Sequence, residues 1–417
     1  MQMKTKKSCL VVASLLAWLP LGANANESKG VELINAGDLA GAFEQFTLCS
    51  EEPQCQSNLA IMYERGEGVK QDYEKAFLWA SKSAAAGNPY GQNTLGLLYF
   101  NGKGVKKNIP EAIKLFQMSS DQGSPYAKYN LGDAYTKGTD VKKDEKQGFK
   151  FFSESADLGY KFSQRALADM YRDGLGTKTD KQKAAAWYQK AANQGDSYSQ
   201  NELGWMYYEG IGVAKDQMLA KELFEKADAS KFLNAKANLG HFYKSGPEHM
   251  RDPKKSFDYF LAAAKLGHVG AAEFVGHAYL NGGGIMEPDL KSALDWYSKS
   301  ANGGNSGAQM LVGVMYGKGV GTEKNYADAV YWIAQSARAG FSEAPAAIKE
   351  YLPNLYAYTF TGKAASLRNK KDETSEVLGS VKSGQKLYRL LDGGQYYMVY
   401  QPVGHQVGFI NKSLLKE

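Results

Sequence analysis

The chain has 417 residues, a length that accommodates two or three ordinary domains, and aromatic residues make up 12% of it. This aromatic content and a count of only 11 prolines exclude a chain that is disordered throughout. The formal net charge of +6 is too small to predict nucleic-acid binding. After residue 25, no apolar run approaches the roughly 20 residues that a membrane-spanning helix needs.

The first 25 residues have the features of a secretory signal peptide. Lysines in "MKTKKS" precede the apolar run "CLVVASLLAWLPLG", and "ANA" supplies a small-residue cleavage site after Ala25. The run is too short for a membrane anchor, and Cys9 lies too early to be the modified cysteine of a lipoprotein. We therefore expect cleavage near Ala25 and a mature protein that is periplasmic or secreted.

Two cysteines, Cys49 and Cys55, follow the predicted cleavage site in "CSEEPQC". In an oxidising compartment such a pair predicts a disulfide. A redox centre more typically has the spacing CxxC, and a zinc site needs more ligands than these two. The surrounding residues 26–56 are predicted to form an incomplete first repeat unit.

The strongest pattern in the sequence is an internal repeat of 36 residues. A glycine stands three residues after each repeated tyrosine, and a glycine or alanine stands three residues before it. The last interval is 37 residues because one residue is inserted around "NGGGIMEPDL". The repeated tyrosines are Tyr63, Tyr99, Tyr135, Tyr171, Tyr207, Tyr243, Tyr279 and Tyr316.

Each repeat predicts two helices that pack against each other. Small residues with large apolar neighbours at three- and four-residue spacing indicate close helix packing. The glycine after the tyrosine is suited to end the first helix, because a left-handed conformation is cheap only for glycine. An Asp or Asn follows as the cap of a second helix, which closes on another glycine in most repeats. Such units must stack to bury their apolar faces, which predicts a mostly α fold, an α-solenoid.

The pattern L-G-x-x-Y-x-x-G-x-G-V, followed by Asp-x-x-x-Ala and Ala-Ala-x-x-Gly, resembles the Sel1-like repeat family, which is related to the tetratricopeptide repeats. The resemblance covers residues 57–340 and implies a non-catalytic adaptor that binds other proteins. Residues 341–355 are predicted to be a capping helix. Departures from the pattern occur late in the chain, at Lys231, in the loop "SGPEHMRDP" and at the insertion.

Residues 356–417 predict a small β-barrel, because short strand-like runs and turn-rich stretches replace the helical period. Their order resembles bacterial Src-homology-three-like domains, which commonly bind peptidoglycan peptides or proteins. Tyr396 and Phe409 replace the two tryptophans usual in that family. We expect the ligand surface of this domain to comprise Tyr396, Tyr397 and Phe409.

The sequence carries no specific motif of catalysis or metal binding. No GxSxG, HExxH or CxxC occurs, and "GGG" at 282–284 follows a predicted helix and not a strand. His241 and His277 are 36 residues apart, but no carboxylate or cysteine joins them at ligand spacing. We therefore predict no catalytic residue, no cofactor and no metal site.

Partner binding is expected on the concave face of the solenoid, which the first helices of this class line. Four aromatics stand nine residues before consecutive repeat tyrosines, and two arrangements fit them: wedges between repeats, or an exposed aromatic ladder. The predicted partner-binding residues are Tyr90, Phe100, Tyr126, Phe162, Arg165, Arg172, Tyr198, Trp205, Tyr208 and His241.

The sequence thus predicts an exported adaptor that holds a protein partner in the bacterial cell envelope. The alternative is a peptidoglycan-binding regulator of cell-wall-processing enzymes that acts through its C-terminal barrel.

Overall fold

The computed structural model describes residues 25–138, 141–362, 364–372 and 374–415. Apart from Ala25, the predicted signal peptide lies outside the described residues. The described residues up to 216 form one compact unit and those from 217 onward form a second. Within the described residues, no helix is long and apolar enough to cross a membrane.

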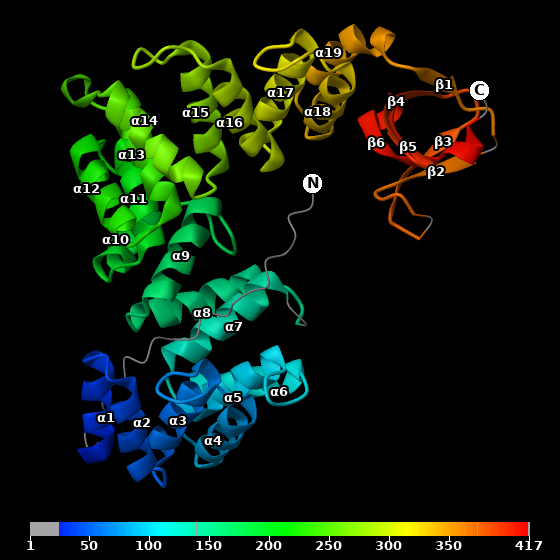
Figure 1. Cartoon of the computed structure of the whole chain (residues 1–417). Coiled ribbons are helices and arrows are strands. Elements are labelled where there is room, and N and C mark those ends of the chain that lie inside the picture. Colours follow the sequence, from blue (N-terminus) through cyan, green and yellow to red (C-terminus); the bar gives the residue numbers. More distant parts are fainter. Residues whose placement is uncertain (1–24, 139–140, 363, 373, 416–417) are drawn as a thin grey trace. The chain divides into compact units, whose positions relative to one another are not determined.

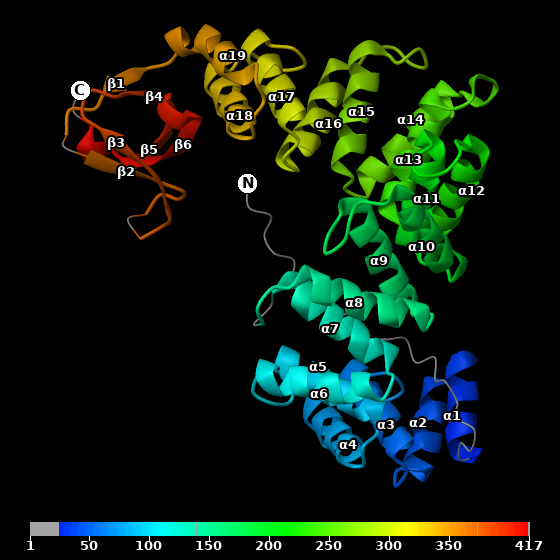
Figure 2. The same cartoon turned by 180° about the vertical axis from the view of Figure 1, so that it is seen from behind.

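Helices alternate along the repeat region as predicted, and Figures 1 and 2 show the two helices of a repeat side by side wherever both lie in the same compact unit. The first helices are α3 (Pro53–Arg65), α5 (Pro89–Asn101), α7 (Pro125–Lys137), α9 (Lys161–Asp173), α11 (Ser197–Glu209), α13 (Leu233–Ser245), α15 (Val269–Asn281) and α17 (Ser306–Lys318). The second helices are α4 (Tyr73–Ala85), α6 (Ile109–Asp121), α8 (Glu145–Asp157), α10 (Lys181–Asn193), α12 (Gln217–Ala229), α14 (Pro253–Lys265), α16 (Leu290–Asn302) and α18 (Tyr326–Arg338).

The turn between the two helices of a repeat has the predicted caps. In all eight repeats, the N–H of the Asp or Asn cap donates to the carbonyl of the repeat tyrosine at 2.8–3.0 Å. In seven repeats, the glycine that ends the first helix has a φ of 67–76°, a left-handed conformation that favours glycine. Gly246 is the exception, with a φ of −72°.

The second glycine of the turn is required for a different reason: it contacts the backbone of the preceding repeat. A Cβ at Gly104 would lie 2.0 Å from the carbonyl oxygen of Tyr73, which opens the second helix of the unit before. A Cβ at Gly176 would lie 2.1 Å from the oxygen of Glu145 in the same way. Only a residue without a side chain allows this approach of backbone to backbone.

The late departures from the repeat are local changes of its loops. Lys231, between α12 and α13, adopts a φ of 61° where other repeats have glycine. The loop after α13 contains the short 3-10 helix η1 (Glu248–Met250). The insertion after α15 contains three consecutive glycines with positive φ, residues 282–284.

Two helices precede the first full repeat, α1 (Ala25–Asn35) and α2 (Leu39–Leu48). The predicted disulfide is confirmed: it joins Cys49, at the end of α2, to Cys55, in the first turn of α3. Both cysteines are buried in an apolar cluster with Phe46 and Leu59. The bridge therefore fixes the turn between the N-terminal helices and the first repeat.

A short helix α19 (Ala344–Tyr351) and the 3-10 helix η2 (Leu352–Asn354) follow the last repeat and lead into a sheet. Its strands are β1 (Ala357–Thr359), β2 (Ala364–Arg368), β3 (Val377–Lys382), β4 (Lys386–Gly393), β5 (Tyr396–Gln401) and β6 (Gln406–Asn411). All pairs are antiparallel, and the order is β1-β4-β5-β6-β2-β3.

The segment predicted as a small β-barrel forms this six-stranded antiparallel sheet, which is not closed. β1 and β3 lie at opposite ends of the strand order and do not pair. Glutamine side chains reach β3 instead: the amides of Gln406 and Gln401 each donate at 3.2 Å to the carbonyls of Leu378 and Ser380. A Cβ at Gly379 would collide with the Gln406 side chain, so glycine makes room for it.

One face of the sheet packs on the last repeat. Strand alternation puts Met398 and Tyr400 on the same face of β5, and both join an apolar cluster that contains Val330 and Ile333 of α18. The opposite face forms a separate core around Leu367 and Val399. The last repeat and the sheet therefore share a core.

Candidate functional site

The four aromatics at matching repeat positions all lie at the second residue of a first helix. Tyr90, Tyr126, Phe162 and Tyr198 occupy this position in α5, α7, α9 and α11. All four are half-buried. Their arrangement lies between the two alternatives that the sequence left open, because each ring packs against neighbouring repeats and keeps part of its surface accessible.

A fifth aromatic, Tyr160, links the first three rings into one row. Tyr90 and Tyr126 have ring centroids 6.0 Å apart, and Tyr126 meets Tyr160 edge-on at 5.1 Å. Tyr160 then contacts Phe162 at 5.4 Å. Burial raises the pKa of Tyr90, Tyr126 and Tyr160, so these phenols stay neutral at physiological pH.

Arg165 continues the row from Phe162 to Tyr198. Its guanidinium lies 5.2 Å from the ring centroid of Phe162 and 5.5 Å from that of Tyr198, within cation–π distance of both. Its Nη1 also lies 3.2 Å from the carboxylate of Asp196, the buried cap of α11. Three of the predicted binding residues are thus in direct contact. We call the row Tyr90, Tyr126, Tyr160, Phe162, Arg165 and Tyr198 the aromatic row.

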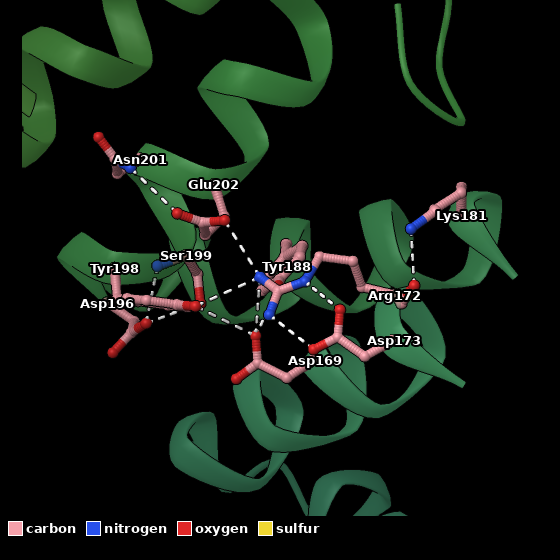
Figure 3. Close-up of polar contacts among 10 residues, drawn as sticks. All are labelled: Asp169, Arg172, Asp173, Lys181, Tyr188, Asp196, Tyr198, Ser199, Asn201 and Glu202. Carbon is pink, nitrogen blue, oxygen red and sulfur yellow. Dashed lines mark hydrogen bonds and ion pairs between the residues drawn. The ribbon is translucent and has the colours of Figure 1, made fainter. Parts of the chain in front are cut away.

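Arg172, near the end of α9, is the centre of a polar cluster that spans α9, α10 and α11 (Figure 3). Its Nε and Nη2 donate to the two carboxylate oxygens of Asp173 at 2.8 and 2.9 Å. Its Nη1 donates to the Tyr188 hydroxyl at 2.8 Å and to Glu202 at 3.1 Å. The partners of Arg172 are Asp169, Asp173, Tyr188, Tyr198 and Glu202.

The acids around Arg172 do not share one electrostatic environment. The hydrogen bond from Arg172 lowers the pKa of Asp173. Burial raises the pKa of Asp169 and that of Glu202, and in both cases this exceeds the opposing effects of hydrogen bonds and of Arg172. Asp169 also accepts hydrogen bonds from the hydroxyls of Tyr188 and Tyr198. The cluster is therefore a preorganised network in which Arg172 compensates two half-buried acids, Asp169 and Glu202.

Two other predicted residues, Phe100 and Tyr208, lie deeper than an exposed binding surface requires. Phe100 is 6% exposed and packs in an apolar cluster with Phe116. Tyr208 is 7% exposed, and the ring of Trp205 stacks on it with centroids 5.5 Å apart. Phe100 and Tyr208 therefore offer little surface to a partner, whereas Trp205 is half-buried.

A scan against protein-family models matches eight copies of the Sel1 repeat. The matched residues are 53–88, 89–124, 125–160, 161–196, 197–227, 233–268, 269–305 and 306–341. The chain belongs to the Sel1 repeat family. Sel1 repeats generally serve as non-catalytic scaffolds for protein interactions, and no enzyme family is indicated.

Two solved structures are similar to part of this chain, and the first has the same repeat fold. The chain is 31% identical to a Sel1 repeat protein from Oxalobacter formigenes over 57% of this chain and 99% of that one, with a TM-score of 0.51. It is 25% identical to a protective antigen present in uropathogenic Escherichia coli strains, over 79% of this chain and 80% of that one, with a TM-score of 0.48. A search of the curated proteins finds no match.

His241 lies in the sixth Sel1 repeat, within the unit that begins at residue 217. Its ring packs edge-on against Phe260 and Phe274, each at 5.0 Å between centroids. Burial lowers its pKa, which keeps the imidazole neutral. His277 instead shares a hydrogen bond of 2.7 Å with the Tyr297 hydroxyl. In the described part of the chain, no three His, Cys, Asp or Glu side chains form a group suited to a metal ion.

The three aromatics predicted for the C-terminal ligand surface do not share one face of the sheet. By strand alternation and pairing, Tyr396 and Phe409 lie on the face that packs on the last Sel1 repeat, and Tyr396 is buried. Tyr397 lies on the opposite face. There it stacks on Tyr358 at 5.5 Å, and Lys412 lies 4.4 Å from its ring centroid.

Sequence reasoning missed several members of the site. Tyr160 stands where neighbouring Sel1 repeats have Asn, Ser or Asp caps. An aromatic residue at a capping position is the sequence feature that could have identified it. Asp169 and Glu202 carry no motif. Their role depends on which helices meet Arg172, so only the structure identifies them.

Proposed function

We propose that this chain is an exported, non-catalytic adaptor that holds a protein partner in the cell envelope. The partner would contact the first helices of repeats two to five on the predicted concave face. The observation that carries the proposal is the aromatic row, in which four half-buried rings, the buried ring of Tyr160 and Arg165 make one continuous strip across four repeats. Tyr, Trp and Arg are the residue types that dominate the binding energy of protein interfaces.

Export is supported by the predicted signal peptide and by the disulfide between Cys49 and Cys55. Disulfides persist in oxidising compartments such as the periplasm or the extracellular space.

The test is crosslinking in intact cells, followed by purification of the chain and mass spectrometry of what it carries. Phe162→Ala combined with Tyr198→Ala should reduce capture of the principal partner by at least about tenfold, as expected for interface anchors. Trp187→Ala is the matched control, because Trp187 is a half-buried aromatic on the second helix α10. Unchanged capture by a folded double variant would contradict the proposal.

The second candidate is a peptidoglycan-binding regulator of cell-wall-processing enzymes that acts through a Src-homology-three-like C-terminal domain. It is favoured by one cluster on the sheet, in which the Arg389 guanidinium lies 5.1 Å from the ring of Tyr356 and 5.3 Å from that of Tyr397. Sedimentation of the full chain with purified peptidoglycan distinguishes the two. The adaptor predicts no specific retention, whereas the alternative predicts retention that Tyr397→Ala abolishes.

A further inference from the structure

A cavity of about 530 Å³ lies beside the aromatic row, where the loops between repeats two, three and four meet the starts of the first helices. Its volume falls within the range of pockets that bind small molecules and peptide side chains. The rings of Tyr90 and Tyr126 line it, with centroids 6.0 Å apart and planes tilted by 55°. Pro89, Pro125 and Leu158, which is 55% exposed, add further apolar surface. The cavity therefore presents mainly aromatic and apolar groups.

The cavity carries little charge. Lys161 is the only lining residue with a charged side chain, and none is acidic. The Lys161 ammonium donates a hydrogen bond of 3.5 Å to the carbonyl of Gln194 and lies 5.4 Å from the ring centroid of Phe162. A basic ligand therefore finds no counter-ion here, and an acidic ligand finds one cation that is already bonded. Charge complementarity favours an uncharged ligand.

The hydroxyls of Tyr90 and Tyr126 are available as hydrogen-bond donors. Among the described residues, neither hydroxyl has a hydrogen-bond partner, and neither is fully buried. Burial of the rings raises the pKa of both phenols, so each keeps its proton at physiological pH. A ligand that brings carbonyl oxygens to the cavity can therefore accept a hydrogen bond from each of them.

Several backbone carbonyls of the lining residues, in contrast, already accept hydrogen bonds at 2.6–3.5 Å. The occupied carbonyls are those of Pro89, Pro125, Gly159 and Gln194, and the donors are the side chains of Ser119, Ser155, Gln194 and Lys161. The side-chain carbonyls of Gln122 and Gln194 belong to exposed residues, where water competes for them. A peptide N–H that is buried without an acceptor costs free energy comparable to a lost hydrogen bond. The cavity therefore disfavours a backbone with an N–H at every residue.

We propose that this cavity binds a proline-rich, uncharged segment of the partner polypeptide in the polyproline II conformation. Proline has no backbone N–H, so its burial leaves no donor unpaired. A polyproline II segment makes no internal hydrogen bonds, so its carbonyls can accept from the hydroxyls of Tyr90 and Tyr126. Aromatic-lined grooves are a known binding site for such segments. The inference rests on the proposed adaptor function and names the part of the partner that the cavity recognises.

The experiment uses the full chain, immobilised, and a library of decapeptides with six randomised central positions. Both ends of each peptide are blocked, by an acetyl and an amide group, so that no terminal charge contributes. We expect enrichment of peptides with prolines three positions apart, because polyproline II has three residues per turn. Enrichment of acidic peptides, enrichment of apolar peptides without proline, or no enrichment would each overturn the inference.

Replacement of a proline in the enriched peptide separates the missing N–H from the shape of the ring. Alanine restores the N–H, whereas N-methylalanine lacks it but has no ring. We expect the alanine peptide to bind about tenfold more weakly than the proline peptide, as for one N–H left without an acceptor. The N-methylalanine peptide should bind more nearly like the proline peptide. Equal losses from both replacements would overturn the hydrogen-bond argument on which the inference depends.

Three variants of the chain test the assigned groups on the enriched peptide. Tyr90→Phe and Tyr126→Phe each remove one donor and should weaken binding several-fold. Leu158→Gln removes apolar surface and should also weaken binding. The matched controls should leave binding unchanged: Tyr171→Phe changes a half-buried tyrosine outside the cavity, and Leu266→Gln changes an exposed leucine at the same repeat position in repeat six. Unchanged binding by all three test variants would overturn the inference.

The two proposals can fail separately. If Phe162→Ala combined with Tyr198→Ala abolishes partner capture in cells but the chain enriches no proline-rich peptide, the adaptor function stands and the proline site falls. If proline-rich peptides bind as proposed but the double variant still captures its partner, the cavity is a ligand site and the aromatic row is not the partner interface.

Discussion

The contact between α9 and α11 and the contact between α18 and the sheet are filled by different kinds of side chain. At the first contact, Arg172 forms ion pairs with acidic side chains and donates a hydrogen bond to the hydroxyl of Tyr188. These partners lie on helices of repeats four and five. At the second, Val330, Ile333 and Tyr400 belong to one apolar cluster. Both are contacts that the repeat pattern alone does not specify.

The two contacts respond differently to salt and pH. Apolar burial is roughly proportional to area and insensitive to salt, whereas a partly exposed network of charges depends on salt, on pH and on every partner being present. We expect the contact at the sheet to provide stability. The Arg172 cluster fixes the geometry of the helices that carry Phe162, Arg165 and Tyr198.

Tyr400→Ala should have the largest effect on stability. Tyr400 is 1% exposed within the cluster shared by α18 and the sheet, and truncation of a buried aromatic costs about 3–5 kcal/mol. Urea unfolding should show this loss equally at low and high salt. Tyr356→Ala is the matched control: at 54% exposure it should cost less than about 1 kcal/mol. A small loss for Tyr400→Ala would mean that the sheet is not held by this cluster.

Arg172→Ala should cost about 1.5–3 kcal/mol, because it leaves Asp169 and Glu202 without their cation. Unlike the effect of Tyr400→Ala, this loss should shrink in 1 M NaCl, where charges are screened over about 3 Å. Arg172→Lys should lie between wild type and Arg172→Ala, because lysine keeps the charge but lacks the planar fork. A salt-independent loss would contradict an electrostatic contact.

Lys231→Gly should raise the free energy of unfolding by about 0.5–1 kcal/mol, because glycine adopts the φ of 61° without strain. This variant changes a loop between repeats without touching either contact compared above. Thermal unfolding measures the change in melting temperature, which should rise for Lys231→Gly. Lys265→Gly, a substitution in the helix α14, is the comparison and should lower it.

Asp169→Asn should have the smallest effect, and one that depends on pH. Because burial raises the folded-state pKa of Asp169 above its ordinary value of 3.8, the folded chain holds this proton more tightly than the unfolded chain. The stability of wild type relative to Asp169→Asn should therefore increase as the pH falls from 7 toward 4, by less than about 1 kcal/mol. A relative stability that decreases over this range would show that Arg172 outweighs burial.

The repeat architecture could be predicted from the sequence because each repeated residue acts through interactions with residues close to it in the chain. The caps before the second helices and the glycines after the tyrosines act within one turn, so their spacing is enough to identify them. The disulfide could be predicted for the same reason.

The site and the sheet were less predictable because they depend on contacts between distant residues. Phe100 and Tyr208 occupy positions that the repeat leaves variable, yet both are buried, since a variable position is not necessarily an exposed one. Tyr396 and Tyr397 are adjacent in sequence, and the sequence predicts one ligand surface for both. Strand alternation separates their side chains onto opposite faces.

The glutamines that reach β3 bear on the behaviour of the chain at high concentration. A strand at the end of a sheet ordinarily offers unpaired carbonyl and N–H groups to a second molecule, which is a route to edge-to-edge polymerisation. Here Gln401 and Gln406 already occupy two carbonyls of β3, and the opposite end strand, β1, has only three residues. We expect an open sheet with both ends protected in this way to resist self-association without the constraint of closing into a barrel.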